Sequence, residues 1–451
     1  MLMTEKNGLD VTCVSPAAIS AWDRMVEQFL SHGRDTPSLL SEVLEADPDY
    51  SLAWCAKGLF TVLLARSELA APAKDALARA EVAIRRRGGT VRERGYLKAL
   101  RHATHGSFQC AVAELEAVLD DCPRDSLAAK LSHSLRFLSG DARGMLESIE
   151  RVVSRAGLDH PHLGYLLGCF AFALEETGAF REAERLGRRS LDRAPRDAWA
   201  LHAILHVYEM TGDAADGADF LASHSRTFEH CNNFGFHLQW HLALFRLELG
   251  DVEGALRLYD ERVRAEKTDD FRDISNAVSL LMRLELAGAS VGRRWDELSA
   301  IAERRIADRS LVFASLHYTL ALVGAGRYDL AQQLAAGLGR DRSPRDQARI
   351  AREIGASAAE ALVAFGERRY GEAASGLLAL RPNILRIGGS KAQRDLFEQM
   401  LIEACIRAGQ GQQAVALVHE RLSGRRMNRF ATERLVRIPI GAFRKGERLQ
   451  S

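Results

Sequence analysis

A glycine followed five residues later by an alanine recurs along this chain at nearly constant spacing, most clearly from Gly106, Gly178, Gly250 and Gly326. With the weaker copies, the turn glycines, as we call them, are Gly106, Gly140, Gly178, Gly212, Gly250, Gly288 and Gly326. They lie 34, 38, 34, 38, 38 and 38 residues apart, a period typical of stacked helix-turn-helix units. The apolar residues follow helical spacing, so we expect an all-α fold of about ten antiparallel helix pairs without a β-sheet.

Two prolines mark the ends of repeat units. Pro123 and Pro195 each lie 17 residues after a turn glycine, Gly106 and Gly178 respectively. Glycine readily adopts the left-handed conformation that ends a helix, and proline cannot continue one. This arrangement resembles the tetratricopeptide repeat. The resemblance implies an α-solenoid superhelix of antiparallel helix pairs, with the first helix of each pair lining a concave face where ligands usually bind.

The chain has three predicted parts. Residues 1–30 form an N-terminal helical cap, residues 31–420 a tetratricopeptide-like repeat superhelix, and residues 421–451 a basic C-terminal helix or tail. Besides Arg421, the basic residues of this tail are Arg425, Arg426, Arg429, Arg434, Arg437, Arg444, Lys445 and Arg448. We expect the tail to be a solvated terminal helix with a frayed end.

Charge and cysteine content narrow the class of protein. Lys and Arg number 61 against 60 Asp and Glu, so no net field attracts nucleic acid or an anionic membrane. The seven cysteines include no CxxC pair, which is typical of a reducing compartment. The N-terminus lacks a signal-peptide pattern, and no apolar stretch approaches the roughly 20 residues of a membrane span. We therefore expect a cytoplasmic protein that binds neither nucleic acid nor membrane.

Histidines are concentrated in one part of the chain. Six of the 14 lie between His202 and His241, and four of these form the pairs His202/His206 and His237/His241. A spacing of four residues puts both rings of a pair on one helical face. Offsets from the turn glycines place His202, His206 and Glu209 on the inward face of one first helix, and His237 on the inward face of the next. We therefore expect these four residues to project into one shared concavity.

These groups suit two kinds of chemistry. His202, His206, Glu209, His237 and His241 could bind zinc or iron and leave a position for an activated water or oxygen. Without a metal, the candidate catalytic residues are His206, Glu209 and His241, acting as general acid or base. The alternative is that the histidines contact a bound peptide or are buried and bonded to the backbone. No His-Glu-x-x-His motif is present to decide between them.

Six stretches of the chain are similar to the tetratricopeptide repeat protein 38 family. They are Ala171–Glu176, Asp197–Met210, Trp240–Phe245, Arg283–Gly288, Val291–Trp295 and Gly389–Glu398. The resemblance runs over nearly the whole chain and implies a pocket inside a helical superhelix. The pocket residues that it implies are His202, His206, Glu209, His237, His241, His317, Arg394 and Asp395. Trp240 joins them because its offset from Gly250 places it on the inward face beside His237.

The most distant part of this predicted pocket comes from a late helix. Ser390, after Gly388-Gly389, has the position of an N-cap for a helix running to Arg407. On it, Arg394 and Asp395 are predicted to close the cavity. The arginine would face a carboxylate-bearing ligand and the aspartate would orient a histidine.

Two departures from the family pattern concern the ligand. Relatives tend to have Asn where this chain has Leu238, and His or Asn where it has Lys391. A lost amide and an added ammonium disfavour a bound cation and favour an anionic ligand.

Two functions therefore stay open. The first is an interaction module that holds a peptide or a small polar or anionic ligand in a His-rich concave groove, its partner being a peptide, a protein or a small molecule. The second is a metal-dependent or acid/base enzyme with its active site inside the superhelix. Outside the groove, Cys169 and Cys231 are expected to be small buried residues, and His160 and His162 to be solvent-exposed.

Overall fold

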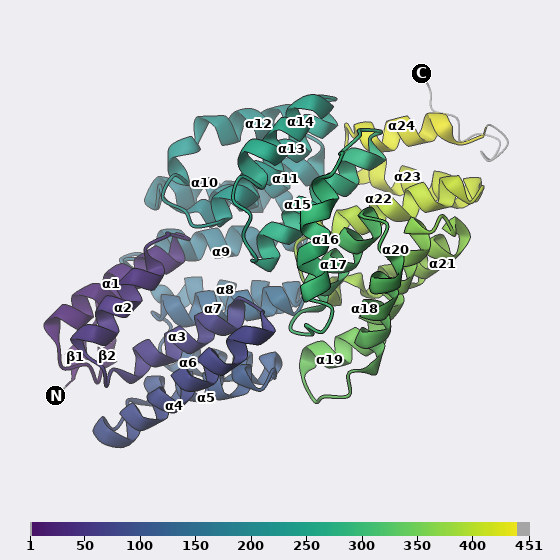
Figure 1. Ribbon diagram of the computed structural model, residues 1–451. Coiled ribbons are helices and arrows are strands. Elements are labelled where there is room, and N and C mark those ends of the chain that lie inside the picture. The colour runs from purple at the N-terminus through teal and green to yellow at the C-terminus, as the bar shows by residue number, and fades with distance from the viewer. Residues whose placement is uncertain (1, 440–451) are drawn as a thin grey trace. The chain divides into compact units, whose positions relative to one another are not determined.

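The computed structural model describes residues 2–439, and these are almost entirely helical (Figure 1). They form two compact units. Unit 1 contains residues 2–207, Ser223–Gly235 and Ser343–Gln347. Unit 2 contains Tyr208–Ala222, Phe236–Arg342 and residues 348–439.

Unit 1 begins with a two-stranded antiparallel ribbon and continues as helix pairs. The ribbon joins β1 (Met3–Thr4) to β2 (Asp10–Val11). The helices that follow are α1 (Pro16–Leu30), α2 (Thr36–Ala46), α3 (Ser51–Leu63), α4 (Ala70–Arg87), α5 (Val91–Thr104), α6 (Phe108–Asp121), α7 (Ser126–Leu138), α8 (Ala142–Ala156), α9 (Leu163–Glu176) and α10 (Phe180–Arg193). Successive members such as α3 and α4, α5 and α6, and α9 and α10 pack against each other. Helix α11 (Ala198–Thr211) begins in unit 1, and its last turn belongs to unit 2.

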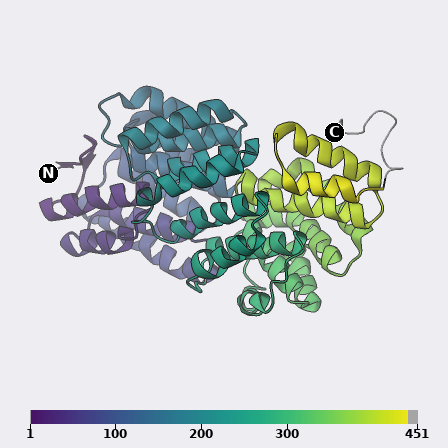
Figure 2. The ribbon, with the colours of Figure 1, turned by 90° about the horizontal axis from the view of Figure 1, so that it is seen from above.

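Unit 2 repeats the same plan. Its helices are α12 (Ala214–Ser223), α13 (Phe234–Glu248), α14 (Val252–Leu258), α15 (Phe271–Leu286), α16 (Arg294–Arg304), α17 (Val312–Gly324), α18 (Tyr328–Arg340), α20 (Ala356–Gly366), α21 (Tyr370–Leu380), α22 (Lys391–Arg407), α23 (Gly411–Gly424) and α24 (Arg429–Arg437). The short α19 (Asp346–Ile350) starts in a segment of unit 1. The yellow helices α23 and α24 lie side by side in both views (Figure 2).

The turn glycines behave as the sequence predicts. All seven have positive φ, between 69° and 91°, as does Gly409. Each ends a helix in a conformation that a side chain would strain. The alanines that follow the clearest copies, Ala111, Ala183, Ala255 and Ala331, are fully buried where paired helices meet. The prediction of an all-α fold of stacked helix pairs is confirmed.

Two expectations were wrong in detail. The N-terminal segment is not wholly helical, because the β1–β2 ribbon precedes α1. The start of the basic tail is not solvated, because Arg425 and Arg434 are buried and α24 packs on α23. The arginine side chains there pair with buried carboxylates instead of being hydrated by water. Arg444, Lys445 and Arg448 lie outside the described residues.

The predicted boundaries at residues 30 and 420 stay predictions. Helix α1 ends at Leu30, and Glu420 lies within α23. No helix within residues 2–439 combines the length and the apolar character needed to cross a membrane.

Candidate functional site

In unit 1, the first histidine pair lies on α11 against the end of α9. The rings of His202 and His206 have centroids 4.2 Å apart, as expected for residues on one helical face. His206 Nδ1 lies 3.1 Å from Oε2 of Glu175, and both side chains are buried. One oxygen of Glu176 completes a set in which the three ligand atoms lie within 4.8 Å of one another. Unit 1 therefore contains a buried His-Glu-Glu cluster.

In unit 2, the second histidine pair belongs to α13. His241 Nδ1 lies 3.1 Å from Oε2 of Glu209, and His237 Nδ1 lies 2.9 Å from Oδ1 of Asn276 on α15. The indole of Trp240 stacks on His237 with ring centroids 5.2 Å apart, and it is fully buried. Each pair thus has a carboxylate beside it in its own unit. Convergence of the two pairs on one ion stays a prediction.

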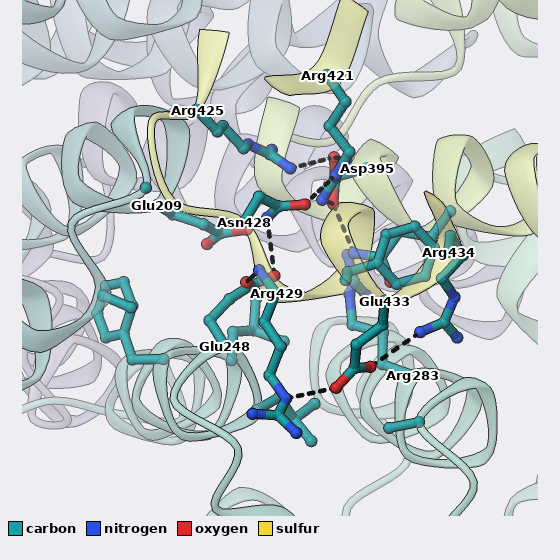
Figure 3. A pocket seen from close by; sticks show the side chains of 18 of the residues that line it. Glu209, Glu248, Arg283, Asp395, Arg421, Arg425, Asn428, Arg429, Glu433 and Arg434 are labelled. Atoms are coloured by element: carbon teal, nitrogen blue, oxygen red, sulfur yellow. Dashed lines mark hydrogen bonds and ion pairs between the residues drawn. The ribbon is translucent and has the colours of Figure 1, made fainter. Parts of the chain in front are cut away.

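Unit 2 also contains a cavity of about 100 Å³. It is bounded by the ends of α13 and α15 and by α22, α23 and α24, and five arginines and four carboxylates line it (Figure 3). The arginines are Arg283, Arg421, Arg425, Arg429 and Arg434, and the acids are Glu209, Glu248, Asp395 and Glu433. Asn428 and Gln399 add amide groups. Ligand pockets for drug-sized molecules measure roughly 300–1,000 Å³, so this cavity fits one polar group of a ligand.

Asp395 anchors one wall of the cavity. Arg421 donates to both of its oxygens at 2.5 and 2.9 Å, and Arg425 lies 2.9 Å away (Figure 3). Burial by itself would raise the pKa of Asp395, but the two guanidinium groups outweigh it and hold that pKa well below its usual value. Asp395 is therefore an ionised structural anion, and its contacts are to arginines and Gln399 rather than to a histidine.

The other wall carboxylates also have partners. Glu248 accepts from Asn428 Nδ2 at 2.9 Å and from the backbone N–H of Arg429 at 2.7 Å. Glu433 lies 2.7 Å from Arg429 and 3.4 Å from Arg434. Glu209 pairs with His241, whose Nδ1 lies 3.1 Å from Oε2 of Glu209. The acidic groups of the cavity are thus occupied by protein donors.

Arg283 differs from the other arginines of the cavity. Its side chain is almost completely buried, and among the described residues no carboxylate lies within ion-pair distance of it. Its guanidinium donates to the Ser279 side chain and to the Ala392 carbonyl at 2.9 Å, and lies 5.5 Å from the Trp240 ring centroid. Burial lowers the pKa of Arg283 to about 10 although Asp395 and Glu209 oppose this. A buried cation without a counter-ion favours an anion beside it.

Two further predicted pocket residues of unit 2 are Arg394 and His317, and their place in the His-rich groove stays a prediction. Arg394 is buried, does not line the cavity, and donates to the carbonyls of Gly388 and Gly389, so it fastens the loop before α22. The Ser390 cap itself is present as predicted. His317 on α17 is buried, and its Nδ1 donates to the Phe313 carbonyl at 2.8 Å. Burial lowers the pKa of His317 to about 4.

His317 makes stability depend on pH. Its folded pKa of about 4 lies below the ordinary value of 6.5, so between these the unfolded chain binds one proton more. The free energy of unfolding should fall by about 1.4 kcal/mol per pH unit from this residue as pH decreases through that window. In His317→Phe the slope should be smaller by that amount in urea titrations from pH 7 to 4.5. An unchanged slope would show that His317 titrates normally.

Several residues around the two clusters were not predicted as site residues. Glu175 and Glu176 belong to a stretch that carries the family resemblance, but only the fold brings them to His206. Arg283 likewise lies in such a stretch. Arg421 and Arg425 were assigned to the solvated tail, and no pattern in the sequence shows that α23 packs beside α22.

The smaller expectations had mixed outcomes. Cys169 and Cys231 are buried, as predicted. His160 and His162 are buried, which contradicts the expected exposure. Their loop packs at the N-terminal end of α7, where His162 Nδ1 lies 2.7 Å from Ser126 Oγ, and His160 Nε2 donates to the carbonyl of Arg124, which precedes the helix, at 2.9 Å.

No protein-family model matches the chain. Among solved structures, the chain is similar to one described as Naa15/Naa10 bound to HypK-THB, with 11% sequence identity and a TM-score of 0.26. The match covers 89% of this chain and 68% of that chain. The helical-repeat fold of this chain follows from its own helix pairs and turn glycines.

Proposed function

We propose that the protein is a tetratricopeptide-like binding protein whose unit 2 cavity takes a carboxylate group of a peptide or small molecule. The observation that carries the proposal is Arg283, a buried guanidinium that faces the cavity without a carboxylate partner in the described chain. The carboxylates of the cavity wall have protein donors already. The missing anion is therefore supplied by a ligand.

A carboxylate is the anion that fits best. Arginine presents a planar fork of N–H donors, which matches the two oxygens of a carboxylate. The cavity of about 100 Å³ holds such a group but not a whole ligand of ordinary size. The amides of Gln399 and Asn428 offer further hydrogen bonds at its wall. A ligand that presents one carboxylate and leaves its remainder outside satisfies all of these features.

The proposal is tested by comparing acids with their amides. We expect succinate, or a short mixed-sequence peptide with a free C-terminus, to bind at least roughly tenfold more tightly than succinamide or the amidated peptide, because a charge-assisted hydrogen bond is lost. Isothermal titration calorimetry measures both. Binding by the peptide acid alone identifies a peptide as the ligand, and equal binding by succinate identifies a small molecule. Equal affinity for acid and amide, or no binding of either acid, contradicts the proposal.

A metal-dependent enzyme is the second candidate, favoured by the cluster of Glu175, Glu176 and His206 in unit 1. One imidazole and two carboxylates are suitable ligands for zinc or iron, the metals expected from the sequence. Elemental analysis of the purified protein should then find about one equivalent of metal. The metal should be lost in His206→Ala and kept in His105→Ala, an exposed control. A metal-free protein that binds neither ion on addition excludes this candidate.

We also propose that the chain is a relative of the tetratricopeptide repeat protein 38 family and is cytoplasmic. The six similar stretches and the cysteine content support these assignments. A partner of protein or peptide type agrees with the helical-repeat fold.

A further inference from the structure

A buried lysine in unit 1 has no carboxylate at ion-pair distance among the described residues. Lys130 on α7 is 4% exposed. Its Nζ lies 3.9 Å from Cys169 Sγ on α9 and 4.3 Å from the ring centroid of Trp199 on α11. A thiol and a ring face are weak partners for an ammonium group, which retains unused N–H donors. Burial of such a charge is costly unless an anion accompanies it.

Among residues 2–439, two further polar groups beside Lys130 have no hydrogen-bond partner. His133, one turn further along α7, is 3% exposed, and neither of its ring nitrogens has a hydrogen-bond partner in the described part of the chain. Burial and the nearby Lys130 hold the pKa of His133 well below its usual value, so its ring is neutral and offers one N–H donor. The Nε1–H of Trp199, whose ring centroid lies 5.9 Å from that of His133, is also buried and unbonded. Buried polar groups in folded proteins are normally satisfied, so these three require an explanation.

The nearby acid does not supply the missing acceptor. Asp197 accepts from Ser190 Oγ at 2.8 Å and from the backbone N–H groups of Trp199 and Ala200 at 3.1 and 3.3 Å. Asp197 interacts with Lys130 only by longer-range electrostatic attraction, without a direct ion pair. The Trp199 ring is otherwise surrounded by rings, with the centroids of Phe172, His202 and His32 at 4.5, 4.9 and 5.4 Å from its own. Hydrogen-bond donors therefore outnumber hydrogen-bond acceptors around Lys130.

We propose that Lys130, His133 and Trp199 form a second, buried site for a small oxyanion, either a carboxylate or a phosphate group. The ammonium group supplies the charge, and the imidazole and indole N–H groups supply hydrogen bonds. The aromatic wall strengthens these bonds by excluding water. The site lies wholly within unit 1, so the outcome of its test does not depend on whether the unit 2 cavity binds a ligand.

Anion-dependent stability tests this site. The midpoint of thermal unfolding is measured in sodium acetate and in sodium phosphate, each against sodium chloride at equal ionic strength, so that general screening cancels. The variants are Lys130→Met, His133→Phe and the exposed control Lys98→Met. An anion that binds the folded state raises the midpoint by an amount that grows with the logarithm of its concentration once this exceeds the dissociation constant. We expect this rise in the wild type and in Lys98→Met, and an apparent affinity at least roughly tenfold weaker in Lys130→Met and His133→Phe.

The two anions distinguish the source of the oxygen atoms. A rise with acetate alone that both site variants weaken identifies a carboxylate site, and such a rise with phosphate alone identifies a phosphate site. An equal rise in the wild type and both site variants, or no rise in the wild type with either anion, overturns the proposal. In the second case water satisfies Lys130, His133 and Trp199. If Lys130→Met does not fold, His133→Phe gives the same comparison.

Discussion

Replacing Asp395 with asparagine is expected to lower the free energy of unfolding by about 3–5 kcal/mol. The substitution keeps the shape of the side chain but removes the charge that compensates Arg421 and Arg425. Both guanidinium groups then stay buried together, and Arg283 provides a third positive charge at the same cavity. Chemical denaturation of Asp395→Asn beside the wild type measures the loss. Asp329→Asn, an exposed substitution in the same unit, should have little effect.

The pH dependence of this loss is a second check on its cause. The pKa of Asp395 is lowered in the folded state, so its stabilisation is fully present above the unfolded value of about 4. It decreases as pH falls below that value toward the folded pKa. The difference between wild type and Asp395→Asn should therefore be constant from pH 7 to 5 and shrink at lower pH. A loss below about 1 kcal/mol at pH 7 would show that the arginines do not depend on Asp395.

Replacing Arg92 with methionine should destabilise unit 1 to a similar extent, by about 3–5 kcal/mol. Arg92 lies between two buried carboxylates, donating to Glu5 at 2.8 and 3.2 Å and to Asp125 at 2.6 Å. Asp125 also accepts the Tyr96 hydroxyl at 2.9 Å and caps α7. Without Arg92 the carboxylates would be buried with no counter-charge, so one of them must take up a proton or the fold must open.

Acid conditions separate this explanation from a simple loss of packing. Burial already raises the pKa of Glu5, although Arg92 opposes this. Removal of Arg92 should raise it further, so the deficit of Arg92→Met in urea unfolding should become smaller as pH falls from 7 to 5. Arg94→Met, on the exposed face of the same helix, serves as the control. A deficit that does not change with pH would point to lost packing instead.

Much of the fold was predictable because each repeat unit is specified locally. A turn glycine is required only by its own positive φ. The alanine five residues later is required only because a neighbouring helix lies close to it. The same is true of Ser390, which caps α22 through its own side chain. The β1–β2 ribbon was missed because its strands are two residues long, too short for any alternation to show.

The candidate sites were predicted less well because they depend on packing between distant segments. The histidine pairs were recognisable because both members lie on one helix. The partners of His206 and Asp395 lie 31 and 26 residues away, on other helices. Arg394 and Asp395 illustrate the limit, since adjacent residues on a helix point in different directions. Asp395 lines the cavity, whereas Arg394 fastens a loop.

The most direct test of the central claim is carboxylate binding by Arg283→Met. Arg283 has no carboxylate partner in the described chain, so the wild type bears the cost of a buried, unpaired charge. The substitution removes this cost, which offsets the loss of the hydrogen bond to the Ala392 carbonyl. We therefore expect the free energy of unfolding to change by no more than about 1–2 kcal/mol. Succinate and the free-acid peptide should bind at least roughly tenfold more weakly than to the wild type or to Arg426→Met, an exposed control. Unchanged affinity in Arg283→Met would contradict the account, because the cavity would then bind its ligand without the cation that defines it.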